Sequence, residues 1–508
     1  MKTLSTIIII FIGYSLATAQ NYQVTSSQKI SNSTSILNIL DEDWFGYYIE
    51  PIGDLDGNKI TDLAVSAVKD NDGGNNKGAI YILYMNLNGT VSSYQKISQT
   101  QGNFGGQLGQ YELLGTGLKY LGDLNNDGFF ELAVGAEYNS EFSYRSGALW
   151  ILSIDNSGVV QNTQKLPDTN LFNISMWDVF GSDVTTVGDL DNNGTIDLAV
   201  GSRRYNDKGA VYILYMNSNL TIQSYNRIAE NEGGFGSLDY QDYFGGAVAN
   251  IGDINNDGYP ELAVSAYRDD DGGTNKGAVY ILFLDQNGNV SNYQKISEQF
   301  GNFNDTLNND TQFGLSISET SDINQDGLSE IIVSASGYTD ASQNQYGSFY
   351  IINLNADGTV NDYTQYANGL QNLNINNDSD DGFAMSVADV GLSDDGFYTI
   401  AIGSHLDDSA SENQKGSFYL LKLSVSLNIE DFSTEDNFVF PNPTQDKIYF
   451  KDSTKLDKVQ VFDQSGKLVS ISTNTQESMD LSGLPVGSYI VKLIYKNKHT
   501  ESYKILKK

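Results

Sequence analysis

Short apolar runs alternate with polar, Gly-rich segments along this chain, and the same order of runs returns six times. The clearest copy is Phe244–Ala266, which reads FGGAVANIGDINNDGYPELAVSA. In each copy a later apolar run follows a glycine, and these glycines are 62, 68, 69 or 70 residues apart: Gly78, Gly147, Gly209, Gly277, Gly347 and Gly416. Units of this length that cannot bury their own apolar faces pack on their neighbours, so the period predicts a stacked or radial array.

Each copy contains four predicted β-strands. The first precedes a polar loop, the second is of the LAVSA type, the third of the YILYMN type and the fourth of the YQKIS type, as at Tyr94–Ser98. The second strands begin at Leu63, Leu132, Leu198, Leu262, Ile331 and Ile400. The second and third strands are nearly continuous apolar runs, which is expected when both faces of a sheet are covered. The sequence therefore predicts an all-β fold, a six-bladed β-propeller with seven blades as the alternative.

The two ends of the repeat region complement each other. The sixth copy has its third strand after Lys415 but no strand of the YQKIS type, whereas Ser27–Ser31 reads SQKIS before the first copy begins. Pairing of Ser27–Ser31 with Gly416–Leu423 would complete the sixth sheet and cover two strand edges. We therefore expect the N-terminal strand to close the ring.

The polar loop between the first two strands is the chemically specific part of the repeat. In five copies it carries oxygen donors at relative positions 1, 3, 5 and 9 and a backbone carbonyl at position 7, a shortened form of the EF-hand spacing that binds calcium. The predicted ligands are Asp54, Asp56, Asn58, Ile60 and Asp62; Asp123, Asn125, Asp127, Phe129 and Glu131; Asp189, Asp191, Asn193, Thr195 and Asp197; Asp253, Asn255, Asp257, Tyr259 and Glu261; and Asp322, Asn324, Asp326, Leu328 and Glu330.

Electrostatics favour a cation in these loops. Two carboxylates about 4 Å apart repel by roughly 4 kcal/mol at an effective dielectric constant near 20, and a bound ion relieves that repulsion. A polar Asx turn without metal is the alternative, because Asp, Asn and Gly favour turns by themselves. The sixth copy has Leu392 in place of the first Asp and is one residue shorter, so no site is predicted there. The sequence predicts about five Ca²⁺ sites.

Composition restricts the function. The formal net charge is −35, which disfavours nucleic acids and anionic membrane surfaces as partners. The chain has no cysteine and two histidines, His405 and His499, so Cys-His, Ser-His-Asp and His-metal catalysis are close to excluded. We expect His405 to be an exposed loop residue.

The chain ends differ from the repeat region. Residues 1–19 read as a secretory signal, with Lys2, a short apolar run and the cleavage site Ala17-Thr18-Ala19. That run is too short to span a bilayer, and we predict no transmembrane segment. Residues 428–436 are polar and acidic, as in a linker. Residues 437–508 contain short alternating runs such as KIYF at Lys447 and SYIVKLIY at Ser488, which predict a small β-sandwich.

Two family resemblances follow from these motifs. The FG start, the acidic loop and the Gly-Ala element of residues 20–427 resemble FG-GAP repeats, the unit of integrin α-subunit propellers, although Leu114-Gly115 replaces Phe-Gly in the second copy. This resemblance implies metal loops on one face and ligands on the other, at Lys69–Asn76, Arg203–Asp207 and Arg268–Asn275. The motifs FPNPTQDKIYF and YKILKK of residues 437–508 resemble the type A sorting domain of the type IX secretion system.

The second resemblance implies that the secretion machinery exports the chain across an outer membrane, followed by release or attachment at the cell surface. The sequence thus predicts a secreted, calcium-binding, integrin-α-like propeller that acts as a binding or adhesion module for an extracellular protein or glycan, and not an enzyme. The alternative is a carbohydrate-active propeller, a lyase or glycosidase using carboxylate or tyrosine chemistry, because a glycosidase needs only two acids at a fixed separation.

Overall fold

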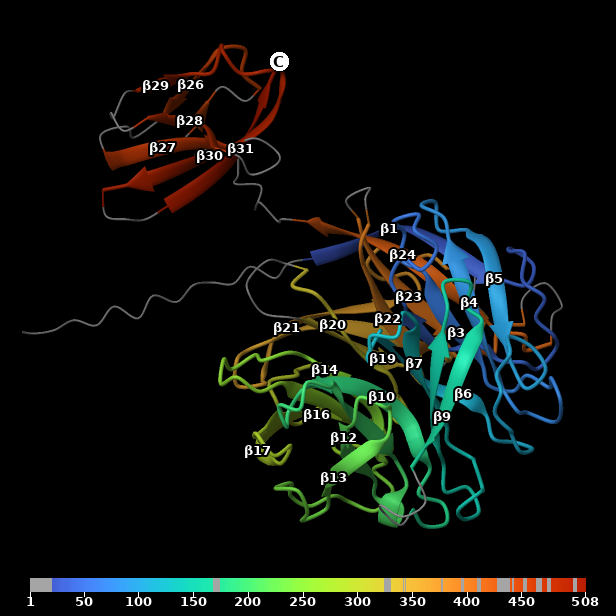
Figure 1. The fold of residues 1–508 in the computed structure, drawn as a ribbon. Helices are drawn as coiled ribbons and strands as arrows, with labels where there is room; N and C mark the ends of the chain where they lie inside the picture. The colour runs from blue at the N-terminus through green and yellow to red at the C-terminus, as the bar shows by residue number, and fades with distance from the viewer. Residues whose placement is uncertain are drawn as a thin grey trace, which may run out of the picture. The chain divides into compact units, whose positions relative to one another are not determined.

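The computed structural model describes residues 21–167, 174–323, 330–340, 342, 344–375, 378–393, 397–408, 413–426, 439–440, 443–450, 455–462, 468–472, 477–496 and 500–508. The chain divides after Ser426 into two compact units (Figure 1). The predicted signal at 1–19 and the predicted linker at 428–436 lie outside the described residues. Each unit is described by itself below.

The described part of the first unit contains six four-stranded antiparallel sheets. The first three are β2 (Phe45–Pro51), β3 (Leu63–Ala67), β4 (Ala79–Met85) and β5 (Val91–Ile97); β6 (Leu114–Gly122), β7 (Phe130–Ala136), β8 (Leu149–Ile154) and β9 (Val160–Leu166); and β10 (Phe180–Gly188), β11 (Asp197–Ser202), β12 (Ala210–Met216) and β13 (Ile222–Ala229). The next two are β14 (Phe244–Asn250), β15 (Glu261–Ala266), β16 (Ala278–Leu284) and β17 (Val290–Ile296); and β18 (Ile317–Glu319), β19 (Glu330–Ala335), β20 (Ser348–Leu354) and β21 (Val360–Ala367). Short 3₁₀ helix η1 (Tyr205–Asp207) joins β11 to β12.

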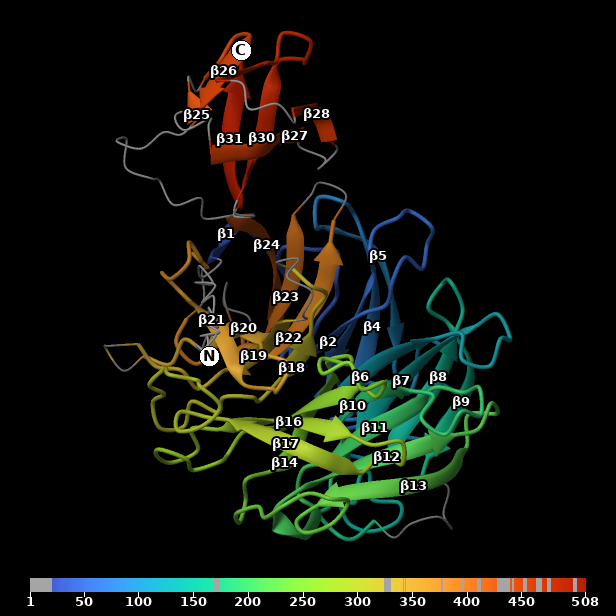
Figure 2. The ribbon, with the colours of Figure 1, turned by 90° about the vertical axis from the view of Figure 1, so that its left-hand side faces the viewer.

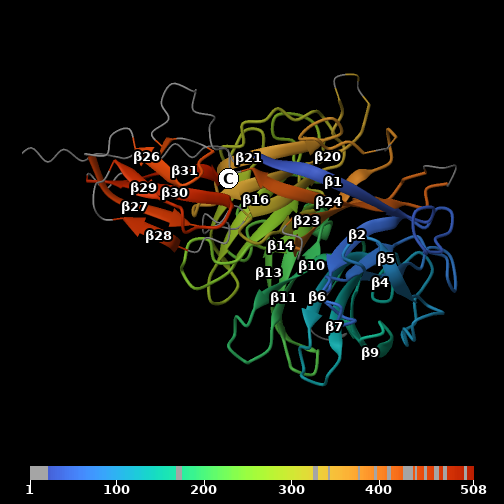
Figure 3. The ribbon, with the colours of Figure 1, turned by 90° about the horizontal axis from the view of Figure 1, so that it is seen from above.

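The sixth sheet combines the two ends of the unit. It contains β22 (Phe383–Leu392), β23 (Tyr398–Ser404) and β24 (Ser417–Ser426), and β1 (Asn21–Ser31) pairs with β24 on the outside. Ser27 lies opposite Leu421 and Ser31 opposite Ser417, so the predicted pairing of the N-terminal strand is confirmed. Figure 3 shows blue β1 running beside orange β24.

The sheets follow one another around a closed ring. The first strand of each sheet contacts the first strand of the next, from β2 through β6, β10, β14, β18 and β22, and β22 contacts β2 again. In Figure 2 several of these strands lie in the middle of the unit, whereas β9 and β13 lie at its rim. One apolar cluster fills each of the six interfaces; the cluster between the first two sheets, for example, includes Ile82, Leu114 and Trp150. The continuous apolar runs of the sequence thus become sheets buried on both faces.

The FG and Gly-Ala motifs have one physical cause, the close approach of neighbouring sheets. The N–H of Phe244 donates to the carbonyl of Lys208 at 2.9 Å, and Phe45 makes the same bond to Lys415 across the closure. A Cβ atom on Gly209 would lie 2.0 Å from the carbonyl oxygen of Phe244, so no larger residue fits there without moving the backbone. The motifs therefore mark the junction between one sheet and the next.

The second unit contains two antiparallel sheets. One holds β25 (Val439–Phe440), β26 (Lys447–Phe450) and β29 (Ser478–Asp480), and the other holds β28 (Leu468–Ser472), β27 (Leu456–Phe462), β30 (Gly487–Tyr495) and β31 (Thr500–Lys507). Ile448 from the first sheet and Val461 and Val491 from the second belong to one buried apolar cluster. The predicted alternating segments therefore form strands that share a core.

Candidate metal centres

Each of the five acidic loops connects the first and second strands of its sheet, as the sequence predicts. In the first four loops the backbone is left-handed at positions 4 and 6, with φ of 58° at Asn192 and 90° at Gly194 in the third loop. Asn and Gly adopt this conformation at low cost, which explains their recurrence. The first loop has Lys59 at position 6, with φ of 72°, in place of glycine.

The acid at position 1 organises each of these loops. The carboxylate of Asp253 accepts hydrogen bonds from the N–H groups of Asp257 and Gly258 at 3.0 and 2.8 Å, and Asp123 and Asp189 make the corresponding contacts. In the first loop Asp54 accepts from Gly57 and Lys59, both at 2.8 Å. These are Asx-type contacts, so the loop fold does not by itself require an ion.

The acid at position 9 is buried and fixed in all five loops. One of its carboxylate oxygens accepts the N–H of position 2 at 2.7 to 2.9 Å, in the pairs Asp62 with Leu55, Glu131 with Leu124, Asp197 with Leu190, Glu261 with Ile254 and Glu330 with Ile323. The second oxygen of Asp62 accepts the N–H of Met85, and that of Asp197 accepts the N–H of Met216. This acid therefore ties the loop to the sheet.

Burial makes the charge at position 9 costly. Desolvation, with a smaller contribution from the carboxylates of Asp257 and Asp253, raises the pKa of Glu261 to about 7. Desolvation likewise raises the pKa of Asp197 to about 6, and it raises those of Asp62 and Glu131. A cation beside such a carboxyl would favour its ionised form.

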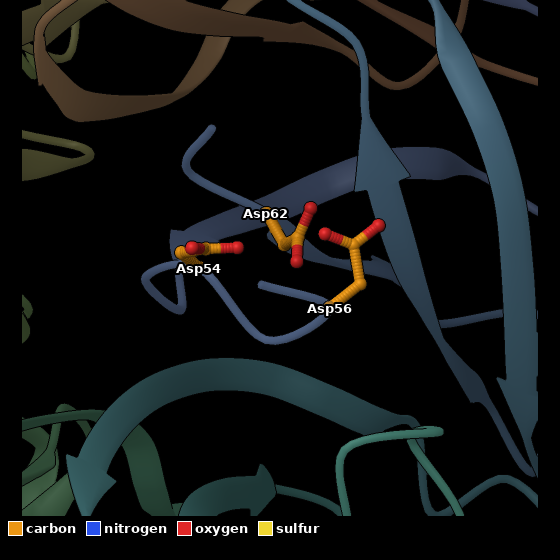
Figure 4. A group of neighbouring side chains, drawn as sticks. All are labelled: Asp54, Asp56 and Asp62. Carbon is orange, nitrogen blue, oxygen red and sulfur yellow. The ribbon is translucent and has the colours of Figure 1, made fainter. Parts of the chain in front are cut away.

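Three of the loops bring three carboxylates together. Oxygen atoms of Asp54, Asp56 and Asp62 lie within 4.8 Å of one another, and Figure 4 shows the carboxylates of Asp54 and Asp56 on either side of Asp62. The same holds in the two other clusters: Asp189, Asp191 and Asp197; and Asp253, Asp257 and Glu261. Clustered carboxylate oxygens on a tight loop are the ligands that hard cations such as Ca²⁺ prefer, so these residues fit the predicted ion.

The remaining loops differ. Among the described residues, Asp123, Asp127 and Glu131 of the second loop do not form such a cluster, although the hydrogen-bond pattern is the same. In the fifth loop Asp322 and Glu330 are described, whereas Asn324, Asp326 and Leu328 lie outside the described residues. In the sixth copy Leu392 is 73% exposed at the end of β22. The amide oxygens of Asn58, Asn125, Asn193 and Asn255 and the carbonyls of Ile60, Phe129, Thr195 and Tyr259 remain predicted ligands.

The expectation for His405 was wrong. This side chain is 8% exposed and packs edge-to-face against the rings of Trp44 and Tyr47, with centroids 5.0 and 5.5 Å away. Desolvation lowers its pKa to about 3, so the imidazole is neutral at physiological pH. The sequence places His405 after a strand, and only the ring of sheets brings the two aromatic residues of the first repeat against it.

Two further features that recur between repeats were not predicted from the sequence. The lysine of the YQKIS strand binds acids in the connection after the second strand: Lys96 contacts Asp70 and Asp72 at 2.6 and 2.9 Å, and Lys295 binds Asp269 at 2.6 Å. In addition, a buried Asp stands two residues before the FG position at four places: Asp43, Asp178, Asp242 and Asp381. The recurrence of QKI and of Asp-x-Phe in the sequence was the available signal for both.

Comparisons with known proteins agree with this architecture. Residues 121–152 and 244–282 match the FG-GAP repeat family, and residues 438–508 match the secretion system C-terminal sorting domain family. Parts of the chain therefore resemble the FG-GAP repeats of integrin α-subunits, and its four-stranded antiparallel sheets follow one another around a ring. More specifically, this chain carries FG-GAP repeats followed by a C-terminal sorting domain of the type IX secretion system.

Individual relatives cover parts of the chain. Human integrin alpha-6 is 36% identical over 28% of this chain and 12% of its own length, and Drosophila melanogaster integrin alpha-PS2 is 27% identical over 50% and 17%. The chain thus spans less than a fifth of the length of these relatives. PorZ, a surface component of the type IX secretion system of Porphyromonas gingivalis, aligns at 11% identity and a TM-score of 0.38 over 94% of this chain and 60% of its own.

The sorting domain implies export, and hence a location at the cell surface or in the medium. Within the described part of the chain, no helix has the length and apolar character needed to cross a membrane.

Proposed function

We propose that this chain is an exported surface protein whose FG-GAP propeller binds calcium ions and an extracellular ligand. The observation that carries the proposal is the presence, in one chain, of FG-GAP repeats and a type IX sorting domain. The repeats suit a rigid recognition platform, and the sorting domain would deliver that platform to the outside of the cell. The proposed order is a signal at 1–19, a propeller at 20–427, a linker at 428–436 and a sorting domain at 437–508.

The propeller is proposed to have six blades. Six four-stranded sheets, the contact of β22 with β2 and the pairing of β1 with β24 all support this number. A seventh blade would need four further strands between two first strands that already touch. The shared core of the two C-terminal sheets likewise supports a sandwich for residues 437–508.

The five acidic loops are proposed as Ca²⁺ sites. Support is strongest for the loops that begin at Asp54, Asp189 and Asp253, because three carboxylates gather in each. The loops that begin at Asp123 and Asp322 are included because they share the ligand spacing and the fixed acid at position 9. When bound, the ion would neutralise these carboxylates and stiffen the hairpin between the first and second strands.

The ligand is proposed to bind the face opposite these loops, formed by the connections after the second strands. We propose a binding protein rather than an enzyme, because the chain has no cysteine and only two histidines to supply a nucleophile or a general base. Loops on a rigid scaffold commonly carry such recognition.

The experiment is a binding screen of the mature full chain, with calcium, on arrays of glycans and extracellular proteins, combined with an assay for released sugar. Saturable binding without product supports the proposal. Release of reducing ends or unsaturated products would replace it with the carbohydrate-active enzyme, and the absence of any bound glycan or protein would overturn the binding role.

A further inference from the structure

Four of the five arginines in the whole chain gather on three neighbouring sheets. Arg145 lies between β7 and β8, Arg203 and Arg204 between β11 and β12, and Arg268 between β15 and β16. These are all connections after second strands, on the face opposite the acidic loops. The fifth arginine, Arg227, lies on β13. The arginines are thus confined to one part of a chain that has 64 acidic residues and 29 lysines and arginines, although acids such as Glu137 and Asp270 lie in the same connections.

The arginines alternate with aromatic rings in a continuous row. The guanidinium carbon of Arg145 lies 4.2 Å from the ring centre of Tyr138 and 4.8 Å from that of Trp177. Arg204 lies 5.0 Å from Trp177 and 5.7 Å from Tyr243. On the other side of Tyr243, Arg268 lies 4.9 Å from the ring centre. We call this set, from Tyr138 to Arg268, the arginine–aromatic row.

Three of the four arginines in these connections have no ion-pair partner in the part of the chain that the structure describes. Among the described residues, the ion pairs include none made by Arg145, Arg204 or Arg268, whereas Arg203 is paired with Glu137. The Nε atoms of Arg204 and Arg268 are buried and have no hydrogen-bond partner in the described part of the chain. Like charges held side by side repel, and an unpaired buried donor is costly, so the row is complementary to an anion.

We propose that the arginine–aromatic row binds an acidic polysaccharide through its carboxylate or sulfate groups. This inference rests on the proposed binding function and names the ligand class for it. A guanidinium that stacks on a ring still has its in-plane N–H donors available, and these match the two oxygens of a carboxylate or sulfate. Several such groups along one polymer chain would engage the three arginines together.

A polysaccharide fits this surface better than an acidic protein segment. Tyr144, whose ring centre lies 5.2 Å from that of Trp177, is 53% exposed, and Tyr240, in the same connection as Tyr243, is 67% exposed. Their rings offer flat apolar surfaces for the C–H face of a sugar. Arginine clusters can also hold acidic peptide motifs, so the exposed rings, rather than the charges, favour a sugar polymer here. The cavity beside the row, which is lined by Arg203 and Tyr267 among others, has a volume of only about 80 Å³. This is smaller than a typical small-molecule pocket, so the ligand would have to bind on the surface.

The test uses the mature full chain with calcium and matched pairs of polymers. Polygalacturonate is compared with its methyl ester, dextran sulfate with dextran, and poly-glutamate represents an acidic peptide. We expect binding to one or both acidic polysaccharides, much weaker binding to the uncharged partners, and weakening with added salt. Each of Arg145→Gln, Arg204→Gln and Arg268→Gln should weaken binding about tenfold.

Arg227→Gln is the matched control, because it makes the same charge change outside the row and should alter affinity by less than about twofold. All variants are first compared with the parent by melting temperature. Equal binding of charged and uncharged polymers would overturn the proposal. So would undiminished binding by the variant that carries all three substitutions, at Arg145, Arg204 and Arg268. Poly-glutamate bound as tightly as the polysaccharides would reassign the row to an acidic protein. Binding of a neutral glycan or a protein alone would leave the binding function standing and remove only this ligand class.

Discussion

The guanidinium of Arg203 donates two hydrogen bonds, of 2.8 and 3.0 Å, to the carboxylate of Glu137 and a third, of 2.8 Å, to the hydroxyl of Tyr267. These residues follow the second strands of three successive sheets, and the pair is largely buried. The contact ties three sheets together on the face that carries the arginine–aromatic row. The neighbouring Arg204, whose Nε is buried, makes no ion pair among the described residues.

Calcium should stabilise the propeller. One site held at 100 times its Kd contributes about 2.7 kcal/mol, so several sites should raise the melting temperature well above that measured in chelator. Asp253→Ala should remove one ion per chain. Asp285→Ala, in the turn between β16 and β17 where Asp285 accepts the N–H of Asn287, should leave the ion count unchanged.

Calorimetry and a metal count per chain measure these effects. Leu392→Asp alone should add no ion, because the sixth loop is one residue short. Identical melting temperatures with calcium and with chelator, together with a count near zero, would return the loops to simple Asx turns.

Gly209→Ala should disrupt the junction between the third and fourth sheets. The new Cβ would meet the carbonyl of Phe244 at 2.0 Å, in a backbone of φ 114°, so we expect a loss of several kcal/mol of unfolding free energy. Gly369→Ala is the control. Gly369 has a similar backbone constraint, with φ of 87°, but a Cβ added there would have no atom within 4 Å. This substitution should lower the unfolding free energy by about 1 kcal/mol. Equal losses in denaturant titrations would contradict the steric explanation.

The lysine contacts of the outer strands should differ in strength according to burial. Lys96→Met leaves the buried carboxylate of Asp70 without its cation and should cost about 3 kcal/mol or more. Lys165→Met removes the partner of the exposed Glu141 and should cost about 0 to 1 kcal/mol. Chemical denaturation of both variants provides the comparison, and a cost for Lys96→Met as small as that for Lys165→Met would show that the buried contact is not a structural clamp.

The buried acids before the FG positions should make the protein more stable at mildly acidic pH. Desolvation raises the pKa of Asp242 to about 6 and that of Asp43 to about 7, from 3.8 in the unfolded reference, with Asp269 and Asp70 respectively adding repulsion. The folded state therefore binds more protons than the unfolded chain between about pH 4 and 7. The contribution of these groups to the free energy of unfolding is therefore greatest below about pH 4, and it is lost as the pH rises through 6 to 7.

Asp242→Asn tests this relation. The amide oxygen can still accept the N–H of Asp239, which the carboxylate accepts at 2.9 Å, so the variant should gain on the order of 1 to 2 kcal/mol at pH 7.5 and show a flatter pH profile. Asp270→Asn, at an exposed position, should not change the profile. Unfolding curves in saturating calcium, from pH 4.5 to 7.5, make the measurement; an unchanged slope in Asp242→Asn would contradict the assignment.

Removal of residues 437–508 should stop export without unfolding the propeller, because the two units have separate cores. Cell fractionation should then find the truncated chain in the periplasm. The purified truncated chain should melt at the temperature of the propeller in the full chain, which excludes misfolding as the cause. Normal surface display of the truncated chain would show that another segment directs export.

The sequence alone determined the order of the strands, the closure of the ring and the position of the acidic loops. This was possible because six copies repeat the same local pattern. Comparison of the copies showed that the sixth lacks a fourth strand and that Ser27–Ser31 has the sequence of one, so the two were predicted to pair. The acid at position 9 was also predictable, since its contact with position 2 is local. In each case the information lies within one repeat or in a comparison between repeats.

Only the tertiary structure decided which side chains from different repeats meet. His405 is buried by Trp44 and Tyr47 because the ring brings the sixth sheet against the first. The net charge of −35 predicted a surface unsuited to anions. The fold nevertheless places Arg145, Arg204 and Arg268 together on one face. A net charge sums over the whole chain and cannot show which charged residues lie close together. Contacts between sheets depend on the curvature of the whole ring, and no single repeat encodes that curvature.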